Sequence, residues 1–459
     1  MGLEAHCGAD VRHIAIISLP LAGHLDPMRA LAGELESRGH KLTLVGPPGM
    51  DGAIEGVDFH ALEDAEYPAG RLSEFLTFLP SVRGLRGIRR VIDEVAALSA
   101  LYVRQLPSAL EDIGADLVLH DQLEPAAGVV AQGMGLAQAS LACALPMNRE
   151  AHLPPPFLGW RYRDSAYGAW LAQGGHRVVD RMMAPQNAVV AEAARQFGLQ
   201  PGQTGSALAD WTAPTCDLGQ CIPGLDYPRE NGPHEVGPLR SQAPLSALPL
   251  ERDGRDLVFC SLGSLMGGRA DIFRRVARAA HELDVQLLVA HGGRLSETEV
   301  AELEALPGRP VLRDFVHQPS VLSEARAAVV HGGFNTVLDA AAAGVPTVLM
   351  PLAFEQHAIA ERVRRAGAGV VVKAKGDLRS ALDNVLNDRV LRRGALELAG
   401  SAAAAGGVVE AAKLVEATQG RSLGKCVQDR DVREPARQTT RTAVRPLLRL
   451  PLLRRLART

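Results

Sequence analysis

Aromatic side chains and long hydrophobic runs are scarce in this 459-residue sequence, in which Phe, Trp and Tyr make up 4% of the residues. No apolar run approaches the ~18 residues that a membrane-spanning helix needs. The first ten residues, MGLEAHCGAD, contain no signal-peptide core. These absences predict a cytoplasmic protein whose only membrane contact is peripheral, on the inner face.

Paired cysteines and metal-binding motifs are also missing. The six cysteines form no CxxC pair and no zinc spacing, so they are expected to be free, reduced thiols. No HExxH motif occurs, and no GxGxxG follows a strand, which disfavours a dinucleotide-dependent redox enzyme. The only DxD pair, Asp429 and Asp431, lies in the basic tail. We therefore expect chemistry without a metal or a cofactor.

Charge is nearly balanced overall, at a net -3, but it is unevenly distributed. Residues 421–459 carry 11 Lys or Arg and 3 Asp or Glu, a net +8, so residues 1–420 carry -11. Phosphate contacts need basic surface, so the acidic body excludes a nucleic-acid-binding protein. The tail has two interpretations: a disordered extension, which its prolines favour, or a peripheral membrane anchor rich in leucine and arginine.

Short apolar segments alternate with helical ones twice along the chain, which is typical of parallel sheets with helices on both faces. The length itself favours two domains. The first half has expected strands at 13–20, 41–48 and 115–121, and the second at 256–262, 285–291, 309–316, 327–331, 345–351 and 369–373. The prediction is an α/β protein with Rossmann-like domains at 1–236 and 257–420 facing a cleft, joined by a linker at 237–256 and followed by a tail at 421–459.

Polar residues at the strand ends of the first half indicate acid–base chemistry. His24 follows the first strand, just before a helix expected to have Asp26 as its cap and Pro27 as its first residue. Asp121 ends another strand and could orient an imidazole in the same crevice. His120 points to the opposite side. Spacing alone leaves open that His24 and Asp121 are unrelated loop residues.

A glycine turn in the second half is a candidate diphosphate site. In the stretch 329–346, a strand runs into Gly332 and Gly333, and a helix is expected near Asn335. The N–H groups at such a helix end attract phosphate. His331 could add a hydrogen bond, and Asp339 could accept from a ribose diol. An ordinary glycine turn with an asparagine cap is the alternative.

These residues carry a resemblance to a known family. The segments DQLEPAAGVVA, CALPMNREAHLPPPF, EVGPLR, FCSLGSLMG and HGGFNTVLDAAAAGVPTVLMPLAFEQ make the chain similar to inverting family 1 glycosyltransferases with the GT-B fold. Among these it most resembles the bacterial group that glucosylates zeaxanthin in carotenoid biosynthesis. The resemblance runs from about His13 to Thr418 and leaves the tail uncovered.

The resemblance implies a role for each matching position. His24 matches the base that deprotonates the acceptor hydroxyl, and Asp121 the carboxylate that orients it. UDP-glucose is the implied co-substrate, and UDP leaves from the face opposite the attack. Phe315 stands where many members have a tryptophan beneath the uracil, and Asp339 where plant members have a ribose-binding glutamate. The implied donor-binding residues are Ser264, Phe315, Val316, Gln318, His331, Gly333, Asn335, Thr336, Asp339, Glu355 and Gln356.

Aromatic residues cluster in the first half in a way that suits an apolar acceptor. All three tryptophans lie between positions 160 and 211, and Phe157, Trp160 and Tyr162 are the candidate acceptor contacts. Taken with the resemblance, a hydroxylated carotenoid such as zeaxanthin is the expected acceptor. A locally packed insertion is the alternative explanation of the cluster.

Other functions stay open at this stage. A macrolide, polyketide or sterol could be the acceptor instead, because the signature reports the donor. A UDP-sugar 2-epimerase of the same fold would need neither His24 nor the aromatic stretch. The presence of both His24 and Asp121 disfavours a non-catalytic partner that binds UDP-sugar.

Overall fold

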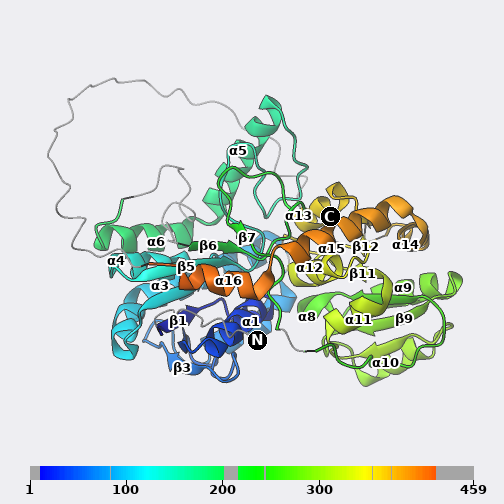
Figure 1. Cartoon of the computed structure of the whole chain (residues 1–459), viewed down its shortest axis with the longest axis horizontal. Helices are drawn as coiled ribbons and strands as arrows, with labels where there is room; N and C mark the ends of the chain where they lie inside the picture. The colour runs from blue at the N-terminus through cyan, green and yellow to red at the C-terminus, as the bar shows by residue number, and fades with distance from the viewer. Residues whose placement is uncertain are drawn as a thin grey trace, which may run out of the picture.

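The computed structural model describes residues 11–82, 84–200, 216–241, 244–353, 355–373 and 375–419, and the predicted tail at 421–459 lies outside them. Two parallel sheets, each covered by helices, form two domains that lie side by side (Figure 1). The predicted α/β class with two parallel-sheet domains is confirmed. Between 237 and 256 the described residues form no helix or strand.

The first domain contains a seven-stranded sheet in the order β3-β2-β1-β4-β5-β6-β7. Alternate residues of the interior strand β1 enter two different apolar clusters, Ile14 and Ile16 in one and Ala15 and Ile17 in the other, so both faces of the sheet are buried. The strands are β1 (His13–Ile17), β2 (Lys41–Gly46), β3 (Asp58–Ala61), β4 (Leu117–Asp121), β5 (Ala137–Ala142), β6 (Cys216–Gly219) and β7 (His234–Glu235).

Helices of the first domain lie on both faces of this sheet. Helices α3, α4 and α6 pack against one another beneath one face, and α1 covers the other. Helix α5 projects from the body of the domain (Figure 1). The helices are α1 (Ala22–Ser37), α2 (Arg71–Phe78), the 3-10 turn η1 (Leu79–Ser81), α3 (Gly84–Ile113), α4 (Pro125–Gly133), α5 (Ala166–Met182) and α6 (Ala184–Gln196).

The second domain is built on a six-stranded sheet in the order β10-β9-β8-β11-β12-β13. Its interior strand β8 (Leu257–Ser261) is buried on both sides. Leu257 and Phe259 belong to one apolar cluster, and Val258 and Cys260 belong to another. The strands are β8 (Leu257–Ser261), β9 (Gln286–Ala290), β10 (Val311–Arg313), β11 (Ala325–Val330), β12 (Thr347–Leu349) and β13 (Gly369–Val371). The helices are α8 (Gly263–Met266), α9 (Ala270–Glu282), α10 (Glu297–Glu304), α11 (Gln318–Glu324), α12 (Phe334–Ala342), α13 (Gln356–Arg365), α14 (Leu378–Asn387), α15 (Arg389–Ala404) and α16 (Gly407–Glu416).

Helix α16 leaves the second domain and returns to the first (Figure 1). Gly406 has a positive φ of 85°, which breaks the path of α15, and the N–H of Gly407 donates to the carbonyl of Val236 at 2.7 Å. Val408, Ala411, Ala412 and Val415 then join the apolar cluster that contains β1 and α1. The expected domain at 257–420 therefore contributes its last helix to the other domain.

The stretch from Arg389 to Glu416 is the one helical segment of the described residues that is long and apolar enough to cross a membrane, judged by length and composition alone. In this structure it is the pair α15 and α16, bent at Gly406. One face of each helix is buried, with Ala395 and Leu398 in the second domain and Ala411 and Ala412 in the first.

A buried ion-pair cluster ties the two domains together. The Asp226 carboxylate accepts hydrogen bonds from Arg229 at 2.7 Å and from Arg362 of α13 at 2.6 Å. The Arg362 guanidinium also lies 4.1 Å from the centre of the Tyr227 ring. Burial raises the pKa of Asp226, but the two arginines more than offset this and hold it below its usual value. A charged Asp226 thereby fixes α13 against the first domain.

Two sequence expectations have different outcomes. Helix α1 begins at Ala22, so Asp26 is not its cap and Pro27 lies inside the helix rather than at its first position. The prediction of the helix start was wrong because proline is common at the first position of a helix, whereas Pro27 lies one turn after the start of α1. Free thiols are confirmed for the described cysteines Cys143, Cys216, Cys221 and Cys260, and Cys7 and Cys426 lie outside the described residues.

Candidate active site

His24 and Asp121 meet at the carboxyl edge of the first sheet. His24 lies in the first turn of α1, directly after β1, and Asp121 is the last residue of the neighbouring strand β4. His24 Nδ1 is 2.6 Å from Asp121 Oδ2. Asp121 is fully buried, whereas the His24 side chain keeps 14% exposure. When Nδ1–H donates a hydrogen bond to the Asp121 carboxylate, the Nε2 atom of a neutral imidazole carries no proton and is free to act as a base.

The surroundings of His24 favour its protonated form. Burial lowers the pKa of His24, but the charge and hydrogen bond of Asp121, together with the charge of Glu355, outweigh it and raise the pKa above its usual value. Glu355 belongs to the second domain, at the start of α13. The base and this candidate sugar-binding carboxylate therefore act on each other across the domain boundary.

Pro27 changes the hydrogen bonding around the base. A proline has no N–H, so it cannot donate to the carbonyl four residues earlier in a helix, which here is that of Gly23. This carbonyl instead accepts a hydrogen bond at 2.9 Å from the side chain of Asn335 in the second domain. The turn that carries His24 is thus attached to the first turn of α12, where the diphosphate was expected.

Gln220 and Arg240 extend this link. The Gln220 amide donates to Asn335 Oδ1 at 2.9 Å and to the Cys143 carbonyl at 2.5 Å. Arg240 donates to Gln220 Oε1 at 3.3 Å and to Asp339 at 2.6 Å. Asp339 is 9% exposed, so a ribose would have to share its carboxylate with Arg240. Sequence reading missed Gln220 and Arg240, although Arg240 ends the quoted segment EVGPLR.

The expected diphosphate site lies where β8 and β11 end side by side. Helix α8, which contains the exposed Ser264, follows β8, and α12, whose first turn contains Asn335 and Thr336, follows β11. Gly333 occupies the cap position of α12. Arg294 donates to the Ser264 carbonyl at 2.8 Å and adds a cation that sequence reading did not single out. The structure therefore brings two helix ends and a guanidinium to one edge.

His331 is buried between these two turns. A Cβ atom at Gly263 or Gly333 would lie 2.7 Å or 2.5 Å from its ring, so both glycines are needed for the ring to fit. Burial lowers the pKa of His331 to about 4, which keeps the imidazole neutral. Its Nδ1 atom is buried without a hydrogen-bond partner. The neutral His331 ring could donate a hydrogen bond from Nδ1 to a phosphate oxygen, which would give that atom a partner.

The candidate base-binding segment follows β10. Phe315 is 71% exposed and presents a free ring face beside Gly293. Val316 packs against the core of the second domain. Gln318 begins α11, and its Oε1 atom is buried without a partner. A groove of about 540 Å³ runs alongside, lined by Gly293, Arg313 and Asp314 among others.

Glu355 and Gln356 have different surroundings at the start of α13. Burial raises the pKa of Glu355, and the nearby His24 opposes this. The Oε1 atom of Gln356 accepts hydrogen bonds from the N–H groups of Leu352 and Ala353 at 2.8 and 2.9 Å. That oxygen shapes the loop, so only the amide nitrogen of Gln356 remains for a sugar hydroxyl.

The candidate acceptor residues lie between the domains. Tyr162 stacks on Tyr227 at 5.2 Å between ring centres, and Phe157 is partly exposed. The Trp160 ring lies against Gly175 of α5 and is 41% exposed. The segment also reaches the second domain, where Arg161 pairs with Glu361 at 3.7 Å. The third tryptophan of the cluster, at position 211, lies outside the described residues.

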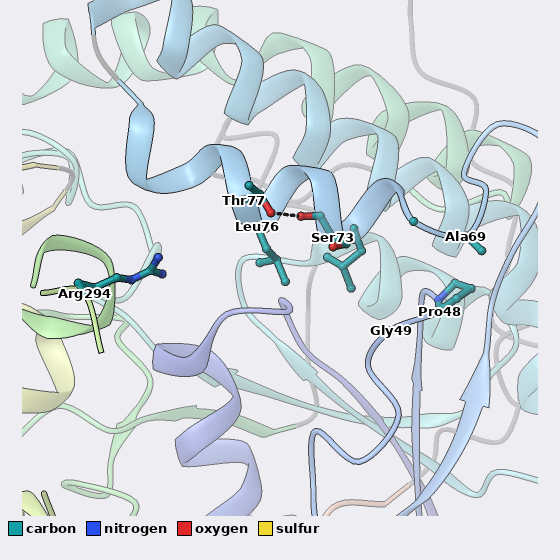
Figure 2. A pocket seen from close by; sticks show the side chains of 9 residues that line it. Pro48, Gly49, Ala69, Ser73, Leu76, Thr77 and Arg294 are labelled. Atoms are coloured by element: carbon teal, nitrogen blue, oxygen red, sulfur yellow. Dashed lines mark hydrogen bonds between the residues drawn. The ribbon is translucent and has the colours of Figure 1, made fainter. Parts of the chain in front are cut away.

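A further groove of about 560 Å³ opens between the domains (Figure 2). The loop after β2 and helix α2 form one wall, with Leu72 and Leu76 as apolar contacts, and Arg294 reaches it from the second domain. The groove therefore joins apolar surface of the first domain to the cation beside Ser264.

Cys143 completes the surroundings of Asp121. Among the described residues, His24, Asp121 and Cys143 form a group whose potential ligand atoms lie within 4.8 Å of one another. Burial, followed by the charge of Asp121, raises the pKa of the Cys143 thiol well above its usual value, so the thiol stays protonated. A protonated thiol and an imidazole paired to a carboxylate suit proton transfer better than they suit a metal ion.

Comparisons with known proteins show which family this chain resembles. Residues 274–418 match the family model described as erythromycin biosynthesis protein CIII-like, C-terminal domain. The chain is 34% identical to a zeaxanthin glucosyltransferase of Pantoea ananas over 87% of this chain and 95% of that one. It is 32% identical to a zeaxanthin glucosyltransferase of Pseudescherichia vulneris, over 88% and 97%. The solved glycosyltransferase of kitacinnamycin superposes with a TM-score of 0.68 at 22% identity, covering 88% of this chain and 98% of that one.

Proposed function

The chain belongs to the family 1 glycosyltransferases, and we propose that it transfers a hexose, glucose, from a UDP-sugar to a hydroxyl group of an apolar acceptor, with inversion at the anomeric carbon. The pairing of His24 Nδ1 with Asp121 Oδ2 at 2.6 Å carries this proposal. It leaves one imidazole nitrogen as a base at the cleft, next to the helix ends of the second domain.

The proposed reaction is a single displacement. His24 Nε2 takes the proton of the acceptor hydroxyl while the oxygen bonds to the anomeric carbon of the sugar. The bond from that carbon to the β-phosphate oxygen breaks, and UDP carries away the electron pair. The proton on His24 is then released to solvent. Asp121 stabilises the charge that His24 gains. Its side chain is fully buried, so water does not weaken this interaction.

We propose that the leaving group needs no metal ion. The first turn of α12, the turn at Ser264, Arg294 and a neutral His331 all lie at the edge where UDP would sit. Together they supply N–H donors and one fixed positive charge to the diphosphate. Full turnover in the presence of a chelator is expected, and loss of turnover that Mg²⁺ restores would contradict this part.

We propose zeaxanthin as the acceptor. Two relatives at 34% and 32% identity bear the name zeaxanthin glucosyltransferase, and each aligns over most of both chains. The interdomain groove has an apolar wall at Leu72 and Leu76, and Phe157, Trp160 and Tyr162 supply aromatic surface in another part of the first domain. An elongated apolar molecule with terminal hydroxyls suits such walls.

The test is incubation of the full chain with UDP-glucose and a panel of zeaxanthin, macrolides and sterols, followed by product mass. We expect the mass of zeaxanthin to rise by one hexose and then by a second. His24→Ala should lose nearly all transfer and still bind UDP. UDP release that does not depend on any acceptor would contradict a transferase, and full transfer by His24→Ala would contradict the role of His24 as the base.

A further inference from the structure

Helix α5 exposes apolar side chains that a water-facing helix would normally bury. Tyr167, Trp170 and Val178 are 56%, 62% and 53% exposed. Tyr167 stacks on Trp170 at 5.9 Å between ring centres, so the two rings form one continuous surface. Figure 1 shows that α5 projects away from the body of the first domain. In a protein with 4% aromatic residues, such a patch marks an interaction surface.

The exposed side chains share one face of α5. At ~100° per residue, Tyr167, Trp170, Val178 and Met182 fall within about 60° of a common direction. The buried residues Gly168, Ala172, Gly175 and Val179 point roughly 110° away, toward the body. The helix therefore has two apolar faces, of which one is satisfied by the fold and the other has no partner among the described residues.

Arginines flank the exposed face. Arg177 and Arg181 lie on the side of Trp170, and the Arg163 guanidinium is 5.9 Å from the centre of the Tyr167 ring. Of the two acidic residues in this segment, Asp180 pairs with Arg149, and Asp164 is exposed. Aromatic rings bordered by arginines complement the boundary between lipid headgroups and acyl chains. There the rings insert among the upper acyl chains, and the guanidinium groups pair with lipid phosphates.

We propose that this face of α5, defined by Tyr167, Trp170, Val178 and Met182, docks on an anionic phospholipid surface. The exposed face of α5 lies close to a candidate acceptor contact, because the Trp160 ring packs against Gly175 of α5. The segment that contains Trp160 also borders the second domain. This inference rests on the proposed function: docking would place the segment that contains Trp160, a candidate acceptor contact, next to a bilayer that holds the apolar acceptor. The surface is separate from the basic tail at 421–459.

The test uses vesicles and needs no reaction. The full chain is sedimented with phosphatidylglycerol-containing vesicles and with pure phosphatidylcholine vesicles. The double variant Tyr167→Ser/Trp170→Ser should bind the anionic vesicles about tenfold more weakly than wild type, because two rings leave the interface. The matched control is Val390→Ser/Leu396→Ser on α15, whose side chains are 57% and 52% exposed. It should bind like wild type.

Two further measurements isolate the α5 face. The same substitutions in a chain that lacks residues 421–459 should again weaken vesicle binding about tenfold, since the tail is not the proposed surface. Turnover of detergent-solubilised acceptor by the double variant should match wild type, which also shows that the variant folds. Failed glucosylation with intact vesicle binding would refute the proposed function and leave the docking face standing.

Three results would overturn the proposal. The double variant could bind anionic vesicles as well as wild type does, or wild type could bind neither kind of vesicle. Light scattering could instead reveal a wild-type dimer that the double variant breaks, in which case a second copy of the chain is the occupant of this face.

Discussion

Asp121→Asn is predicted to remove most of the catalytic rate through the tautomer of His24. In the wild type, Asp121 Oδ1 accepts the Leu123 N–H at 2.9 Å, and Oδ2 faces His24 Nδ1 at 2.6 Å. Asparagine has one oxygen, and the partly buried Leu123 N–H requires it, because a donor left unsatisfied away from water costs up to roughly 1–3 kcal/mol. The NH₂ group then faces His24 Nδ1, and the imidazole proton moves to Nε2, where it blocks the base.

The size of the loss follows from the same geometry. The corresponding exchange in a serine-protease triad lowers kcat by ~10⁴, and we expect kcat to fall by about 10³ to 10⁴ here. The Michaelis constant for the UDP-sugar should stay within a factor of about three, because Asp121 contacts no residue of the expected donor site. Steady-state assays of UDP release measure both constants.

The pH profile gives an independent check. The base must be neutral, so wild-type turnover rises with pH through the pKa of His24, which Asp121 raises. In Asp121→Asn the residual rate should therefore begin to rise at lower pH. Asp217→Asn is the matched control, a carboxylate of the same sheet held by Ser140 and Asn148. A loss in kcat of less than tenfold, or an unmoved acidic limb, would refute the tautomer argument.

Three further predictions concern the domain contact, the link to the base and a buried acid. Arg362→Met should lower the free energy of unfolding by about 1.5–3 kcal/mol, because Asp226 loses one of its two charged partners and keeps only Arg229, and the double variant with Asp226→Asn should show a non-additive loss in urea denaturation. Gln220→Leu should lower kcat about tenfold with little change in the donor Michaelis constant, because Asn335 and the Cys143 carbonyl lose a common donor. Gln220→Glu cannot donate either, so it should show the same loss in kcat. Burial raises the pKa of Glu124 from 4.5 to about 8. Between pH 4.5 and about pH 8 the folded state therefore holds a proton that the unfolded chain has lost, and the free energy of unfolding falls as the pH rises through this range. Glu124→Gln should flatten that dependence, measured as urea midpoints at about pH 5 and about pH 8; a slope equal to that of wild type would contradict the raised pKa.

The fold and the His24–Asp121 pair could be predicted from the sequence for one physical reason. Buried parallel strands read as continuous apolar runs, and their carboxyl ends meet at one edge, so residues that end neighbouring strands come together. His24 and Asp121 are separated by 97 positions in the chain and still meet by this rule. The start of α1 was misplaced because Pro27 is compatible with either a helix start or a helix interior.

The rest of the site depends on contacts that no local pattern records. Gln220 reaches Asn335 across 115 positions, and Arg240 reaches Asp339 across 99. Both are single polar residues in irregular segments, where periodicity carries no information. The aromatic cluster is visible in the sequence, but only the packing of α5 against the body separates the half-buried Tyr162, which stacks on Tyr227, from the exposed face of α5.

The return of α16 to the first domain has a consequence for synthesis of the chain. Met28, Leu31 and Leu35 of α1, made near the start, share an apolar cluster with Val408, Ala411 and Val415 of α16, made near the end. While a ribosome is still elongating the chain, the domain that carries His24 has an uncovered hydrophobic face. We therefore expect the first domain to finish folding only after the second has been synthesised, and ribosome-bound intermediates that lack α16 to expose an apolar surface that chaperones bind.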